Sequence, residues 1–255
     1  MTRRLGLILP LLLILGWEAG AILINNPFYL PRLESVIPVL LNPFSTDYTL
    51  GTGSIVDNAL VSMQRVTIGF GIAAAVAIPL GIGMGRSSWI NDFFDITIEM
   101  LRPIPPLAWV PLALAWFKLG IASIVFIIFI GSVFPILLNT IDGVRGVKKT
   151  WIEVGTTLGA SERQVLTKII VPGAAPTIWT GLRVGFGIAW MCVVAAEILP
   201  GPTSGLGYLI MYAYNLGQMN VIIAGMITIG VIGLGIDSIF KTVERRLFRW
   251  RGLDR

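Results

Sequence analysis

The chain has 255 residues, of which 55% are hydrophobic and only 13% are charged, and its formal net charge is +5. Soluble domains carry about 25% charged residues, so this composition excludes an ordinary soluble protein and predicts an integral membrane protein. The single cysteine, the lack of histidine and the lack of a phosphate-binding loop motif exclude an intrachain disulfide, a multi-cysteine metal site and an ATP site of the common kind, so we do not expect an enzyme.

Six apolar segments of about 20 residues predict six transmembrane helices, near residues 5–24, 59–84, 101–118, 121–141, 174–198 and 219–240. The alternation of a membrane barrel is absent, and only helices and closed barrels satisfy their backbone groups in lipid. We therefore expect one all-α transmembrane domain over residues 1–255. Its parts are the first span with an outer loop (1–58), the core spans (59–240), a cytoplasmic loop within that core (142–173) and a basic tail (241–255).

Glu18, Arg65, Arg183 and Glu197 are the charged residues that lie most plainly inside the expected spans, where a charge is costly and usually lines a path or forms a pair. Arg65, Arg183 and Glu197 are candidates for a solute path, because an Arg guanidinium suits oxyanions. Alternatively, Arg65 pairs with Glu197, Arg183 snorkels or forms a structural pair, and Glu197 serves as a pair or a gate. Glu18, in the first helix, is expected to be structural.

Two short stretches interrupt the apolar pattern. Residues 103–106, Pro-Ile-Pro-Pro, cannot form a plain helix because proline lacks an amide donor and restricts the residue before it. They mark either an architectural break or a gating hinge at the third span. Residues 199–218 carry no charge, and we expect them either to re-enter the membrane or to cap the pore.

Lysine and arginine are distributed unevenly between the connections. Fifteen of the nineteen lie in the N-terminus, the second–third connection, the fourth–fifth connection and the tail, whereas only Arg32 and Lys118 fall on the opposite side. The positive-inside rule therefore places both termini and the 142–173 loop in the cytoplasm. This topology explains the basic charge, so no nucleic-acid partner is expected.

The cytoplasmic loop predicts a pair of short helices. Gly159 can end the first in a left-handed conformation, and Ser161 can cap the second with Gln164 completing a capping box. Pro172 is expected to end this second helix before the fifth span. The first helix has an apolar side, which indicates either a docking surface for a partner or a hairpin resting on the membrane; its residues are Trp151, Ile152, Val154 and Leu158.

The same loop resembles the signature of binding-protein-dependent ABC-importer permeases of type I. That signature reads Glu-Ala-Ala, three residues, Gly, nine residues, Ile-x-Leu-Pro. Its anchors are matched here by Glu153, Gly159, Ile169 and Pro172. Val154 and Gly155 replace the two alanines, and Val171 replaces the leucine.

Further segments over about residues 55–252 look like the nitrate/sulfonate/taurine branch of these permeases. They include LRPIPPLAWVPLALAWFKLG (101–120), SMQRVTIGF (62–70), TGLRVGFGIAW (180–190), VVAAEI followed by SGLGYLI, and the tail VERRLFRWRG. The resemblance implies a permease subunit in a bacterial or archaeal plasma membrane. Its solute would be a small anion such as nitrate, taurine or another sulfonate, with bicarbonate and vitamin precursors left open.

The resemblance also implies partners. A second permease copy (a homodimer, with a heterodimer left open), two ATP-binding cassette ATPases and a periplasmic or lipoprotein solute-binding protein would complete the importer in its lipid bilayer. ATP and magnesium would bind the ATPases, and this chain would hold no cofactor. The short cytoplasmic helix would couple to an ATPase through Trp151, Glu153, Val154, Gly155, Leu158, Gly159 and Ala160.

Two other classes of protein fit the composition less well. A stand-alone secondary transporter or channel would leave the cytoplasmic loop unexplained and would have few ionisable groups and no histidine for a proton relay. A membrane enzyme would need a clustered catalytic constellation, which this sequence lacks.

Overall fold

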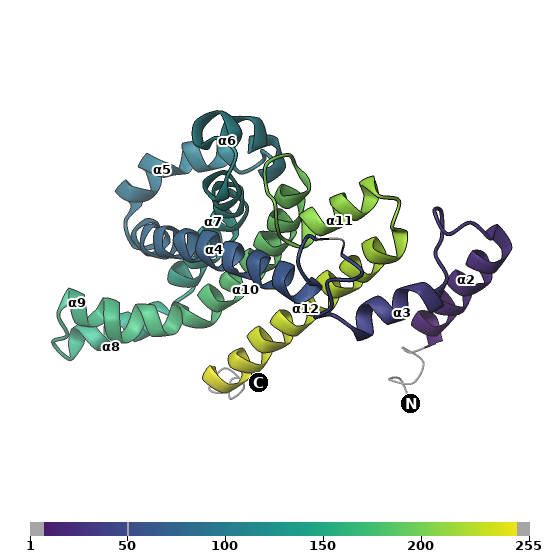
Figure 1. Cartoon of the computed structure of the whole chain (residues 1–255). Helices are drawn as coiled ribbons and strands as arrows, with labels where there is room; N and C mark the ends of the chain where they lie inside the picture. Colours follow the sequence, from purple (N-terminus) through teal and green to yellow (C-terminus); the bar gives the residue numbers. More distant parts are fainter. Residues whose placement is uncertain (1–7, 50, 249–255) are drawn as a thin grey trace. The chain divides into compact units, whose positions relative to one another are not determined.

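The computed structural model describes residues 8–49 and 51–248, and all the regular structure in these ranges is helical. The all-α prediction is therefore confirmed (Figure 1). In chain order the elements are α2 (Ile8–Ile24), α3 (Leu33–Leu41), α4 (Ile55–Arg86), α5 (Ser88–Leu101), the 3-10 helix η1 (Pro106–Trp109), α6 (Val110–Phe117), α7 (Ile121–Arg145), α8 (Lys149–Thr157), α9 (Glu162–Val165), the π-helix η2 (Leu166–Ile170), α10 (Val171–Ile198), α11 (Leu206–Asn215) and α12 (Met219–Leu247).

Within the described ranges, four helices are long and apolar enough to cross a membrane. They are α4, α7, the continuous run Glu162–Ile198 and α12. The first and third expected spans also form apolar helices, but these are shorter, at Ile8–Ile24 and Pro106–Phe117. Each of the six expected segments thus contains a helix among the described residues, and four of these helices have the full length of a span. Residues 5–7 of the first expected segment lie outside the described residues.

The prolines explain why the third expected span is short. Helix α5 ends at Leu101, and the chain turns before η1 begins with Pro106 as its first residue. Proline suits a first helical position because the amide that it lacks would have no partner there. Residues 88–100 lie in the expected connection between the second and third spans, but together with Leu101 they form α5, whose N-cap Ser87 accepts a hydrogen bond from the Ile90 amide.

The chain divides into two compact units, and the first comprises Met1–Ser62 with Glu197–Ile232. In this unit the Trp17 indole donates to the Pro31 carbonyl (2.9 Å), and the Leu33 amide donates to the Glu18 carboxylate (3.0 Å). These bonds join α2 to the start of α3. Glu18 therefore has a structural partner, as expected.

The second unit comprises Met63–Ala196 with Gly233–Arg255, and its centre is α7. Three glycines of α4 face α7 so closely that a Cβ at Gly69, Gly81 or Gly85 would lie 2.7 Å from a side-chain carbon of α7. Small residues at a helix contact let two backbones approach, which is the usual way that transmembrane helices gain packing energy. The glycine spacing of α4 therefore sets its close fit to α7.

Candidate functional site

The hairpin formed by α8, α9 and η2 is the candidate site, and its turn is made by Gly159. This residue has φ +79°, a left-handed conformation that costs glycine nothing. The Ala160 amide donates to the Gly155 carbonyl (3.0 Å) and the Gly159 amide donates to the Thr156 carbonyl (2.9 Å). This pair of bonds is the Schellman arrangement, so the glycine stop predicted for α8 is confirmed.

Helix α9 begins with the capping box that the sequence predicts. The Gln164 amide donates to the Ser161 hydroxyl (3.4 Å), and the Ser161 amide donates to the Gln164 side-chain oxygen (2.8 Å). Two amides at the helix start, which have no partner within the helix, are thereby satisfied. Local hydrogen bonds therefore fix the entry into the second arm of the hairpin.

The predicted end at Pro172 is wrong, because the helix continues through this residue into α10. Directly before Pro172, the Val171 amide donates to the Leu166 carbonyl five residues back, as in a π-helix. Proline normally breaks a helix because it lacks a donor and its ring meets the carbonyl four residues earlier. The wider π-turn of η2 shifts the carbonyls at this point, so the chain runs on from Glu162 to Ile198 without a break.

The inner side of α8 packs on η2 and on the start of α10. Gly155 is buried, and a Cβ at this position would collide with the Ile169 side chain. At Gly173 of α10, an added Cβ would lie 3.7 Å from the Trp151 ring of α8 and 3.2 Å from a methyl group of Val147. An apolar core supports these contacts; its buried members are Val144, Val147, Val165, Ile170, Ala174 and Ile178. The hairpin is therefore a packed structure.

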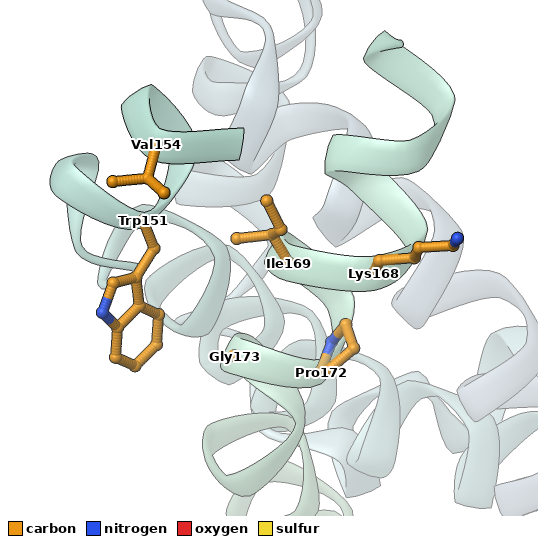
Figure 2. A pocket seen from close by; sticks show the side chains of 6 residues that line it. All are labelled: Trp151, Val154, Lys168, Ile169, Pro172 and Gly173. Carbon is orange, nitrogen blue, oxygen red and sulfur yellow. The ribbon is translucent and has the colours of Figure 1, made fainter. Parts of the chain in front are cut away.

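The outer side of α8 is apolar and exposed. Trp151, Val154 and Leu158 follow the spacing of one helix face and are 47%, 54% and 82% exposed. A groove of about 480 Å³ borders this face, lined by Trp151, Val154, Lys168, Ile169, Pro172 and Gly173 (Figure 2). An exposed face of large apolar side chains on a packed helix is typical of a surface that binds a partner.

Charged groups surround this apolar face. Glu153 is exposed on α8, and the ammonium of Lys148 lies 5.4 Å from the centre of the Trp151 ring. Glu162 of α9 forms a long ion pair with Arg86 at the end of α4 (3.8 Å). The seven residues predicted to couple to an ATPase thus lie on α8 and its turn, where Gly155 faces the core, Ala160 is half-buried and the other five are exposed.

Arg183, a predicted solute-path residue, lies on α10 in an ion-pair cluster with α12. Its Nε is 2.6 Å from Asp237 Oδ1, and a guanidinium nitrogen is 3.8 Å from Glu244. Lys241 is 2.7 Å from the other oxygen of Asp237. A small cavity of about 60 Å³ adjoins the pair; its aromatic lining is Phe186, Trp190 and Phe240.

The α12 side of this cluster is not among the predicted site residues. Asp237 and Lys241 are four residues apart on one helix face, which is a recognisable pair signal. Of the other path candidates, Arg65 is 7% exposed on α4 and Glu197 is fully buried at the end of α10. Among residues 8–49 and 51–248, no group of three His, Cys, Asp or Glu side chains could hold a metal ion.

Residues 77–249 match the family described as the binding-protein-dependent transport system inner membrane component. The chain belongs to this family. The match includes the whole α8–α9 hairpin, so the permease signature at Glu153 and Gly159 lies within the matched region. The permease fold and the resemblance stated from the sequence are confirmed.

Curated relatives support the assignment of the permease. A Methanocaldococcus jannaschii protein named as an ABC transporter permease is 58% identical over 243 residues, covering 95% of this chain and 90% of the relative. The nitrate import permease NrtB of Synechocystis is 39% identical (86% and 79% covered), and the taurine transport permease TauC of Escherichia coli is 33% identical (96% and 88%).

A solved structure agrees with the fold of the permease. A chain of the MetNI methionine ABC transporter, in an inward-facing conformation, superposes with a TM-score of 0.66 over 79% of this chain and 97% of that one. The two sequences are only 14% identical, so this likeness concerns the fold. This chain is therefore the permease component of an ABC importer and an integral membrane protein.

Proposed function

We propose that this permease forms the membrane path for a small anion and is driven by separate ATPase subunits that dock on the α8–α9 hairpin. The observation that carries the proposal is the exposed apolar face of α8 on a packed base. A soluble ATPase with a complementary groove would remove Trp151, Val154 and Leu158 from water. ATP and magnesium would bind those subunits, and hydrolysis would take place there.

A continuous helix connects the hairpin to the membrane. Helix α8 contacts η2 through Gly155 and Ile169, and η2 lies within the 37-residue run Glu162–Ile198. At 1.5 Å per residue this run is about 55 Å long, longer than a bilayer core of about 30 Å. A displacement of α8 by a partner would therefore move α10 directly, which is a way to couple ATP binding to the path.

The distribution of charges supports an orientation for this permease. The excess of lysine and arginine beside the hairpin and in the tail supports a cytoplasmic position for both termini and the hairpin, in a bacterial or archaeal cell. Two copies of this chain, as a homodimer, would enclose the path. A periplasmic or lipoprotein solute-binding protein would deliver the solute on the outer side.

The solute is proposed from the relatives named for nitrate and taurine. Both solutes carry an oxyanion group, which a guanidinium binds through forked donors. Arg65, Arg183 and Glu197 remain the path candidates. Arg183 already contacts Asp237, so it would bind an anion only if that pair opened.

Reconstitution tests this proposal against the alternative of a stand-alone transporter or channel. The full-length chain would be placed in liposomes with and without the ATPase encoded beside it and the solute-binding protein, and uptake of labelled nitrate and taurine would be measured. We expect uptake only with both partners and ATP. Uptake without the ATPase would contradict the proposal and favour a secondary transporter or channel.

A further inference from the structure

Three buried polar side chains surround the N-terminus of α11. Asn58 and Ser62 come from the first turns of α4, and Glu197 comes from the last turn of α10. Their exposed fractions are 1%, 0% and 0%. A buried carboxylate is costly unless it is fully hydrogen-bonded, so this cluster calls for a specific explanation.

Each of these side chains accepts a hydrogen bond from a different amide at the start of α11. The Gly205 amide donates to Asn58 Oδ1 (2.8 Å), the Leu206 amide to Ser62 Oγ (2.9 Å) and the Gly207 amide to Glu197 Oε2 (3.1 Å). The first amides of a helix have no partner within it. Here side chains accept from these amides, and the partners of Gly205 and Leu206 lie more than one hundred residues away in the sequence.

Ser62 connects the other two members of the contact. Its hydroxyl accepts from Leu206 and donates to Glu197 Oε2 (2.7 Å), so the carboxylate receives bonds from both α4 and α11. A carboxylate at this position is also favoured by the positive end of the helix dipole. Hydrogen bonds to a charged group are about twice as strong as neutral ones.

The partners on both sides are held in place by further contacts. The Asn58 amide group donates to the Thr52 and Ser54 carbonyls (2.9 Å each), which fixes the orientation of its oxygen. Gly205 has φ +113°, and a Cβ on this residue would collide with the Glu197 carboxylate. Only glycine therefore lets the carboxylate reach the helix start.

We propose that Glu197, acting with Ser62, is a positioning residue that fixes α11 to the ends of α4 and α10 throughout the transport cycle. The segment between α10 and α12 would then move together with α4, and α11 would not open as a separate lid. This attachment is compatible with both expectations for residues 199–218, re-entry and a cap. The role in the cycle rests on the proposed function, whereas the attachment itself does not.

A matched pair of variants isolates the hydrogen bond. Ser62→Thr and Ser62→Val add the same extra volume to a fully buried site, but only threonine keeps the hydroxyl that bonds Glu197 and Leu206. Should the valine variant fail to fold, Ser62→Ala serves in its place, compared with the unaltered chain. Spin labels would be attached to cysteines introduced in place of Leu60 on α4 (63% exposed) and Tyr214 on α11 (55% exposed). Neither residue belongs to the buried cluster.

The distance between the two labels would be measured in lipid nanodiscs on the full-length chain with its co-purified partners, without nucleotide and with a non-hydrolysed ATP analogue. We expect one narrow distance, equal in both states, for the unaltered chain and Ser62→Thr, and a broad distance for Ser62→Val or Ser62→Ala. A distance that changes between the two states in the unaltered chain would overturn the proposal. So would equal distributions with and without the hydroxyl.

Uptake in proteoliposomes separates positioning from simple loss of structure. We expect loss of the hydroxyl to lower the maximum uptake rate about tenfold at unchanged ATP hydrolysis, which corresponds to about 1.4 kcal/mol, with Ser62→Thr close to the unaltered chain. Equal uptake by the threonine and valine variants would overturn the role in transport. If the unaltered chain shows no ATP-dependent uptake, the proposed function fails, and the label distances still decide the attachment.

Discussion

At the scale of single residues, Gly155 determines how closely α8 approaches η2. An added Cβ would meet only the terminal methyl of Ile169, which can rotate away. We therefore expect Gly155→Ala to keep uptake within about twofold, whereas Gly155→Leu should destabilise the contact by about 1–3 kcal/mol through overpacking. ATP-dependent uptake and the melting temperature of the purified complex would measure this. Equal effects of alanine and leucine would contradict the packing argument.

Gly159 differs from Gly155 because its backbone conformation, and not its surroundings, requires glycine. Open space surrounds the position, but its φ of +79° disfavours other residues. Gly159→Val should cost about 1–2 kcal/mol and lower uptake per ATP hydrolysed, and Gly159→Asn should cost less, since asparagine tolerates this conformation. The ratio of uptake to hydrolysis would be measured for both. A valine variant with the unaltered ratio would show that the turn does not contribute to coupling.

Glu153 is exposed, so its replacement should leave the fold intact. Surface substitutions change stability by about 0.5 kcal/mol or less. We expect Glu153→Lys to weaken the association of the ATPase and uncouple hydrolysis from transport, with a smaller effect for Glu153→Gln, which keeps the shape. Co-purification of the ATPase with each variant provides the measurement. Unchanged co-purification and uptake for the lysine variant would refute a charged contact.

The sequence predicts the turn and the cap of the hairpin because local hydrogen bonds form both of them. The glycine stop and the capping box depend on bonds between neighbours within the hairpin, which a short pattern can specify. For Glu197 the sequence leaves a solute path, a pair and a gate open, because its partner Ser62 lies 135 residues away and a short pattern does not show such contacts.

At the scale of elements, the ion-pair cluster of Arg183 joins α10 to α12. Asp237 is shared by Arg183 and Lys241, so Asp237→Asn would remove both short contacts and leave Arg183 only its longer contact to Glu244, whereas Arg183→Gln leaves Asp237 paired with Lys241. We expect the asparagine variant to lower the melting temperature more, because it removes the carboxylate that both cations share. Lys241→Gln is the matched control. A larger loss for Arg183→Gln would contradict the shared role of Asp237.

Two elements, the helix through Pro172 and α5, differ from what the sequence pattern predicts. Proline correctly predicts the break in the helix before η1. At Pro172 it wrongly predicts a second break. The difference is the π-turn, whose bond from the Val171 amide to the Leu166 carbonyl has no clear sequence signal. Helix α5 is not predicted by the search for spans, because this helix is amphipathic and shorter than a span.

At the scale of the whole molecule, composition and segment length were sufficient to predict a helical membrane protein. The family match and the MetNI likeness confirm this fold. Composition does not indicate how the chain is divided, because each of the two compact units combines segments that lie far apart in the sequence. It also does not identify the solute, since the candidates for path residues are few.

The central claim is that the exposed face of α8 contacts an ATPase in the intact importer. A cysteine in place of Leu158, which is 82% exposed, would be cross-linked in membranes that contain the full complex, with Phe93 on α5 (67% exposed) as the control site. We predict that Leu158→Cys forms a cross-link to the ATPase and that Phe93→Cys does not. Efficient labelling of Leu158→Cys by a water-soluble reagent in the intact complex, with no cross-link to the ATPase, would contradict the account.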